Sequence, residues 1–297
     1  MRFLLVLPLA AATLTAALAQ RADAPRPIVI LVHGRGQLGQ DTASLRREWK
    51  RDLDSSLKAV GVAELADQDV RLAWYADILD VDSDSACATP RVSDDSLTFG
   101  DLARGFLGFL AAGGSENESR EMRGLIGELL YAVDPARRCA AERRVGDVID
   151  HAAKERRPVV VVAYSLGSLV AYGALHSRSS VDKDEDIRLL TVGSPLGVRP
   201  IREMVFGEIG DTLRAPIVRA WENVYDRDDM FAGPLEGMTL PRTHDQTRHR
   251  AGSDDPHNLG RYLRDPATGS AILHLLCQAP RRTTSAACDR EQVTGSR

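Results

Sequence analysis

Residues 159–168 read Val-Val-Val-Val-Ala-Tyr-Ser-Leu-Gly-Ser. The four β-branched valines predict a buried strand, and the apolar stretch over 166–177 predicts a helix. Between them stands Ser165, and the small residues Ala163 and Gly167, two positions before and after it, indicate a turn too tight for larger side chains. The order strand, serine, helix is typical of a nucleophile elbow, whose strained turn projects a serine hydroxyl above a sheet. A structural serine at a tight strand end is the alternative interpretation.

Strand and helix patterns alternate along most of the chain. A nearly continuous apolar run predicts a strand over 27–34, and further strands are predicted over 70–75, 158–163, 187–193 and 217–225. Helical spacing of apolar residues predicts helices over 42–60, 138–156, 166–177 and 262–278. This alternation predicts an α/β fold with a doubly wound, mostly parallel sheet. In such sheets functional sites form at the carboxyl ends of the strands, which is where Ser165 is expected.

The overall composition is that of a soluble globular chain. Of the 297 residues, 43% are hydrophobic and 27% are charged, and the net charge is −4. This charge gives no strong field that would favour nucleic acid, so no nucleic-acid partner is expected. No long linker rich in Pro, Gly or Ser divides the chain, which predicts one α/β domain over 20–297.

The first 19 residues have the pattern of a signal peptide. A weakly positive start is followed by an almost wholly apolar stretch over 3–18 and by Ala17-Leu18-Ala19, a small-x-small cleavage motif. A second such motif lies at 22–24. A membrane anchor is the alternative, but the apolar stretch is short for a span, which needs about 20 residues. The sequence therefore predicts export to the periplasm or the medium, with no stable membrane insertion after cleavage.

The chain has four cysteines, all beyond this leader, and an even number in an exported chain favours disulfides. The pairs that close local loops are Cys87–Cys139 and Cys277–Cys288, and these are the predicted pairs. Four buried free thiols are the alternative. The sequence has no CxxC motif, which argues against a redox-active dithiol or a structural zinc site.

The regular alternation of strands and helices is broken over 80–135. An acidic, Ser-rich stretch over 82–95 is followed by apolar residues over 99–112, a polar loop and a helical pattern over 122–133. Two interpretations stay open for this insertion, a lid or cap over the site and two ordinary surface helices.

A serine nucleophile needs a base and an acid that orients the base, and in this architecture the order along the chain is Ser, acid, His. The acid is expected after a later strand, and the strand over 217–225 is followed by Asp-Arg-Asp-Asp at 226–229. Asp229 is the first choice because it precedes the apolar stretch Met-Phe-Ala at 230–232. Asp226 and Asp228 are the alternatives.

Four histidines follow these acids. His257 lies in a loop that runs directly into a helix, which is where this architecture delivers its base, and it is the predicted base. His244 and His249 lie in a charged segment predicted as a loop, and His274 lies in an apolar helix. The histidines and aspartates over 244–257 would also suit zinc, but they lack a rigid ligand spacing, so no metal is expected.

Two backbone N–H groups are expected to stabilise a developing oxyanion. One is that of Leu166, which follows the serine at the start of a helix. The other comes from the glycine-rich loop His-Gly-Arg-Gly at 33–36, where Arg35 is the first candidate and Gly36 the next. The imidazole of His33 is expected to have a structural role in that loop.

Together these motifs resemble the α/β-hydrolase superfamily, on its lipase and esterase side. The matching segments are IVILVHGRG at 28–36, VVVVAYSLGS at 159–168, LLTVGSPLG at 189–197, WENVYDRDDM at 221–230 and DPHNLGRYL at 255–263. The usual motif has Gly where Ala163 stands, which together with the insertion places the chain outside the best-known subgroups. The resemblance implies a Ser-His-Asp acyl hydrolase that needs no cofactor.

The leading functional hypothesis is an exported serine hydrolase that cleaves a small-molecule carboxylic ester or a lipid, with Ser165, His257 and Asp229 as its triad. An amidase, thioesterase or peptidase would use the same triad, and fold and motif do not separate these activities. A non-catalytic scaffold that binds a partner or a lipid is the alternative from a different class.

Overall fold

The computed structural model describes residues 26–80, 82–84, 86–87, 130–178, 185–206, 213, 215–235, 243–248 and 255–277. Its centre is a parallel six-stranded sheet with the strand order β2-β1-β3-β4-β5-β6. The strands are β1 (Ile28–Val32), β2 (Val70–Ala73), β3 (Val159–Tyr164), β4 (Ile187–Val192), β5 (Val218–Asp226) and β6 (Thr243–Arg248). The predicted α/β class is therefore confirmed.

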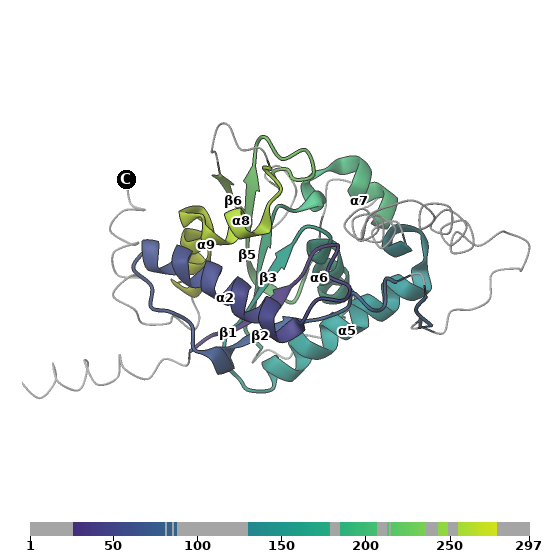
Figure 1. Cartoon of the computed structure of the whole chain (residues 1–297), viewed down its shortest axis with the longest axis horizontal. Coiled ribbons are helices and arrows are strands. Elements are labelled where there is room, and N and C mark those ends of the chain that lie inside the picture. The colour runs from purple at the N-terminus through teal and green to yellow at the C-terminus, as the bar shows by residue number, and fades with distance from the viewer. Residues whose placement is uncertain are drawn as a thin grey trace, which may run out of the picture.

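Helices cover both faces of this sheet (Figure 1). Ile28, Ile30 and Val32 of β1 pack with α5 (Pro135–Ala153) and α6 (Leu166–His176) on one face. The intervening Val29 and Leu31 pack on the other face with α2 (Thr42–Ala59), α8 (Leu259–Arg264) and α9 (Pro266–Cys277). All five side chains of β1 are buried, because a strand of a parallel sheet covered by helices has no solvent-facing side.

The strand order places a topological switch point between β1 and β3. The chain leaves β1 toward β2 on one side, and β3 pairs with β1 on the other side. Val32 pairs with Ala163, so the loops that begin at His33 and at Ser165 leave the sheet side by side. Open α/β sheets bind ligands at such a point, outside the carboxyl ends of the strands.

The structure differs from the sequence prediction in three elements. Thr243–Arg248, predicted as a loop, forms the last strand in the order, and α7 (Arg199–Phe206) was not predicted. The helix predicted over 262–278 is divided into α8 and α9. Asp265 has extended backbone angles (φ −71°, ψ 135°) because Pro266, which follows it, disfavours a helical conformation at the preceding residue.

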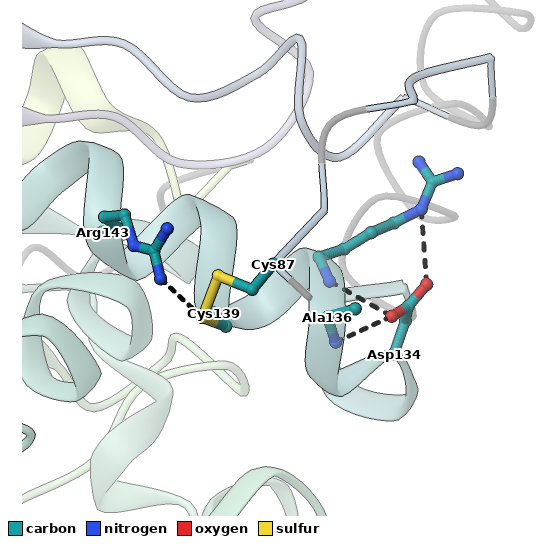
Figure 2. The surroundings of a disulfide bond; sticks show 6 residues. Cys87, Asp134, Ala136, Cys139 and Arg143 are labelled. Atoms are coloured by element: carbon teal, nitrogen blue, oxygen red, sulfur yellow. Dashed lines mark hydrogen bonds and ion pairs between the residues drawn. A yellow bond between two sulfur atoms is a disulfide. The ribbon is translucent and has the colours of Figure 1, made fainter. Parts of the chain in front are cut away.

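A disulfide joins Cys87 to Cys139 of α5, across 52 residues of sequence (Figure 2). The N–H of Cys87 also donates to the carbonyl oxygen of Ala136 in the first turn of α5, at 3.0 Å. Asp134 caps that turn by accepting from the N–H groups of Ala136 and Arg137. These contacts attach the chain that follows β2 to the start of α5.

Several predicted features fall outside the described residues. The leader over 1–19 and Cys288, the predicted partner of Cys277, lie outside them, and so does most of the insertion over 80–135. Within the part of the chain that the structure describes, no helix combines the length and the apolar character needed to cross a membrane.

Candidate active site

Ser165 lies on a strained turn between β3 and α6. Its backbone angles are φ 51° and ψ −127°, and a positive φ is uncommon for a residue other than glycine. A Cβ atom at Gly167 would lie 2.3 Å from the carbonyl oxygen of His33 and 2.7 Å from that of Val32. Glycine is therefore required at 167, because the first turn of α6 lies directly against the backbone that leaves β1.

Two further serines fix the conformation of this turn. The hydroxyl of Ser168 donates its one proton to the carbonyl oxygen of Ser165 at 2.6 Å. It therefore accepts from the hydroxyl of Ser194, which lies 2.7 Å away. Ser194 in turn accepts from the N–H of Leu196 at 3.2 Å. The segment Gly193–Leu196 after β4 is thereby attached to the turn that carries Ser165.

The structure brings Ser165, His257 and Asp229 together. Ser165 Oγ lies 2.8 Å from His257 Nε2, and His257 Nδ1 lies 2.7 Å from Asp229 Oδ2. An ionised carboxylate only accepts hydrogen bonds, so the proton of the neutral imidazole is on Nδ1 and Nε2 is the acceptor for the serine hydroxyl. This arrangement allows His257 to take the proton of Ser165 while Asp229 stabilises the imidazolium that forms.

The candidate acid that contacts His257 is Asp229, and the candidate histidine that contacts Ser165 is His257. Asp228 is exposed, and Asp226 Oδ1 accepts from the N–H of Asp228 at 3.1 Å. His274 on α9 contacts Glu222 Oε1 at 2.5 Å. His244 belongs to β6, and His249 lies outside the described residues.

The carboxylate of Asp229 is buried and receives several donors. Burial raises its pKa, but the hydrogen bonds from His257, from Tyr262 and from the N–H of Phe231 outweigh this effect. The pKa of Asp229 therefore lies below its usual value. The group stays ionised near neutral pH, as an orienting acid must.

The loop after β1 lies beside the serine. A Cβ at Gly34 would lie 3.1 Å from Ser165 Cβ. His33 Nε2 accepts from the N–H of Tyr75 at 3.1 Å, so His33 Nδ1 carries the proton and donates to the carbonyl oxygen of Gly34 at 2.7 Å. In a trans peptide the C=O and N–H groups point in opposite directions, so the N–H of Arg35 points away from the His33 ring. Leu166 begins α6, and its N–H is one of the unpaired donors of a helix start.

His33 has the structural role that its sequence context predicts. Its ring is buried and stacked on Tyr75, with the ring centroids 4.0 Å apart. Burial lowers the pKa of His33 from 6.5 to about 4, although the hydrogen bond to Gly34 acts in the opposite direction. The imidazole is therefore neutral at neutral pH.

This burial predicts a loss of stability in acid. Below pH 6.5 the unfolded chain gains a proton at His33, and the folded chain gains it only near pH 4. The free energy of unfolding should therefore fall as the pH falls from 6.5 to 4, by about 3 kcal/mol from this residue. Urea unfolding at several pH values measures the slope, which should be shallower in His33→Gln. Equal slopes in the two proteins would contradict the prediction.

Sequence reasoning missed three aromatic residues around the triad. The hydroxyl of Tyr262 donates to Asp229 Oδ2 at 2.8 Å, and the hydroxyl of Tyr164 donates to the backbone carbonyl of His257. The Phe231 ring lies beside the His257 ring, with centroids 5.2 Å apart, and the Arg35 guanidinium lies over it. All three aromatic residues lie within five positions of a predicted triad residue, but nothing in the sequence shows where their side chains point.

Among the described residues, no group of three or more His, Cys, Asp or Glu side chains is arranged to hold a metal ion. No protein-family model matches this chain, and no curated protein matches it significantly.

Proposed function

We propose that this protein is a serine hydrolase of the α/β-hydrolase fold that cleaves carboxylic esters through an acyl-enzyme. The observation that carries the proposal is the continuous chain of hydrogen bonds from Ser165 through His257 to Asp229. Two features of the surroundings support it: the strained serine backbone and the position of all three residues beyond the carboxyl ends of parallel strands.

In the proposed reaction, Ser165 Oγ bonds to the ester carbonyl carbon while its proton passes to His257 Nε2. The carbonyl oxygen becomes an oxyanion, which the N–H groups of Leu166 and Arg35 are proposed to stabilise, at about 3 kcal/mol for each donor. The tetrahedral intermediate then expels the alcohol, which takes the proton from His257. Water attacks the acyl-enzyme by the same sequence of proton transfers and releases the acid and the free serine.

Exposed apolar side chains beside the triad favour an ester with an apolar group. Met230 is 79% exposed and Phe231 is 41% exposed, and both follow Asp229 directly in the chain. Large exposed apolar side chains lower the free energy of an apolar acyl or alcohol group that covers them, and the Phe231 ring lies beside the His257 ring. The proposed substrate is thus a small ester or a lipid.

We also propose that the protein is exported, to the periplasm or beyond. The apolar leader predicted over 1–19 supports this, and so does the Cys87–Cys139 disulfide, since disulfides persist in oxidising compartments.

The test is labelling of the purified protein with a fluorophosphonate, followed by mass mapping of the adduct. Labelling at Ser165 is expected, and Ser165→Ala and His257→Ala should abolish it because the nucleophile or its base is missing. Ser177→Ala is the matched control, since this serine is exposed at the other end of α6 and should leave labelling unchanged. Absence of labelling in the folded wild-type protein would overturn the proposal.

The bond that is cleaved needs a second assay. A panel of p-nitrophenyl esters of increasing acyl length, with the matching anilides and thioesters, compares kcat/KM across the three bond types. The proposal expects the esters to have the highest values. Faster cleavage of the anilides or thioesters would show that the protein is an amidase or a thioesterase that uses the same triad.

A further inference from the structure

Tyr262 is a buried residue whose hydroxyl lies in direct contact with the acid of the proposed triad. The residue belongs to α8, just after His257, and its ring is part of the core between α2, α8, α9 and the sheet. The hydroxyl donates to Asp229 Oδ2 at 2.8 Å and accepts from the N–H of Asp226 at 2.9 Å. Both contacts fix the hydroxyl in one orientation.

The two donors share one carboxylate oxygen. His257 Nδ1 lies 2.7 Å from Asp229 Oδ2, the oxygen that also receives Tyr262, while Oδ1 accepts from the N–H of Phe231 at 2.9 Å. Burial and the negative charge of Asp229 both raise the pKa of Tyr262, so its hydroxyl keeps its proton and stays a donor. Rotation of the carboxylate would break all three of these hydrogen bonds.

We propose that Tyr262 is a positioning residue of the triad, which holds the carboxylate of Asp229 toward His257 and takes up part of the charge on their shared oxygen. The catalytic part of this inference rests on the proposed function. A hydrogen bond to a charged group stabilises the charge, so the Tyr262 hydroxyl weakens the attraction of Asp229 for a proton on His257. Its effect is to keep His257 neutral, and able to act as a base, at a lower pH.

The other charged groups near this pair belong to three elements. Among the described residues, Asp226 at the end of β5 is buried beside the Tyr262 hydroxyl, and Asp228 in the turn after it is exposed. Arg35, from the loop after β1, lies over the Phe231 ring next to His257. Tyr262→Phe replaces none of these residues, and the contacts that it removes are the hydrogen bond to Asp229 and the acceptor for the N–H of Asp226.

The first test is Tyr262→Phe, which removes only the hydroxyl. We expect kcat to fall about tenfold. We also expect the acid limb of the kcat/KM profile to move up by about one pH unit, because the carboxylate of Asp229 then lacks the hydrogen bond that stabilised its charge and attracts a proton on His257 more strongly. An NMR titration of the His257 imidazole, assigned from the signal missing in His257→Gln, should show the same upward shift of its pKa without any turnover. An unchanged His257 pKa in folded Tyr262→Phe would overturn the inference.

Tyr164→Phe is the comparison that separates this role from a structural one. Its hydroxyl donates to the backbone carbonyl of His257, whereas that of Tyr262 donates to the carboxylate of Asp229. We expect this variant to lower kcat without moving the acid limb. An equal shift of the acid limb in both variants would show that the loss of either tyrosine hydroxyl shifts the pH profile by disturbing the packing of the site. That result would overturn the role proposed for Tyr262.

A second variant covers the case in which Tyr262→Phe does not fold, since it leaves the N–H of Asp226 without this acceptor. Site-specific 3-fluorotyrosine at 262 keeps the hydroxyl and makes it a stronger donor. The His257 pKa should then move down, and an upward or absent shift would overturn the inference. If the protein fails to label with the fluorophosphonate but the His257 pKa still moves as expected, the proposed function is wrong and the role of Tyr262 stands.

Discussion

Replacing Asp229 with asparagine is expected to lower kcat about 10,000-fold while the fold stays intact. The carboxylate accepts the Nδ1 proton of His257 and so leaves Nε2 free to receive the proton of Ser165. An asparagine amide presents an N–H group at the same place, which stabilises the tautomer with its proton on Nε2. His257 would then be unable to act as the base. The measurement is kcat for a p-nitrophenyl ester at saturating concentration, with thermal unfolding as the check on folding.

Asp228→Asn is the matched control for this experiment. Asp228 is the residue before Asp229 and its side chain is exposed, and the same replacement of aspartate by asparagine can be made there. Its kcat should stay within about twofold of the wild-type value, because the side chain of Asp228 is exposed and the carboxylate that contacts His257 is that of Asp229. A large loss in Asp228→Asn together with a small one in Asp229→Asn would show that the wrong aspartate has been assigned.

The sequence narrows the acid to three aspartates, and only the turn after β5 decides among them. β5 continues to Asp226, whose side chain is buried at the end of the strand. The N–H of Asp229 donates to the carbonyl oxygen of Asp226 at 3.2 Å, which closes a turn and directs Asp229 back toward His257. Nothing in the residue types over 226–229 shows which of the three aspartates points toward His257. The choice therefore depends on the geometry of the turn.

The strands β1 and β3 could be predicted because a strand covered by helices on both faces is a continuous apolar run. The strands β2, β4 and β5 are interrupted by Arg71, Arg188 and Glu222, but each keeps enough apolar residues to be predicted. β6 reads Thr-His-Asp-Gln-Thr-Arg, without such a run, and lies at the end of the strand order with a partner on one side only. A strand of this kind is specified mainly by backbone pairing with β5, which leaves little trace in the residue types. The role of Tyr262 could not be predicted for a related reason, since a tyrosine in an apolar helix looks like any other core residue.

Gly167→Ala is the second substitution for which a large effect is expected. The added Cβ would lie 2.3 Å from the carbonyl oxygen of His33 and 2.7 Å from that of Val32, and both are backbone atoms that no side-chain rotation moves aside. Relief requires α6 and the loop after β1 to separate. We expect the free energy of unfolding to fall by about 3 kcal/mol or more, measured by urea unfolding.

Activity should fall as well, because the same separation moves Arg35 away from Ser165. A displacement of about 1 Å between groups that must act together costs about 100-fold in rate, so the folded fraction of Gly167→Ala should show a loss of kcat of that size. Gly146→Ala is the matched control. Gly146 lies within α5, and apart from its chain neighbours and the backbone of its own helix nothing lies within 4 Å of an added Cβ. Alanine should therefore raise the free energy of unfolding by about 0.5–1 kcal/mol and leave kcat unchanged. If Gly167→Ala proved as stable and as active as Gly146→Ala, the close approach of α6 to the loop after β1 would be wrong, and the oxyanion donors would have to come from elsewhere.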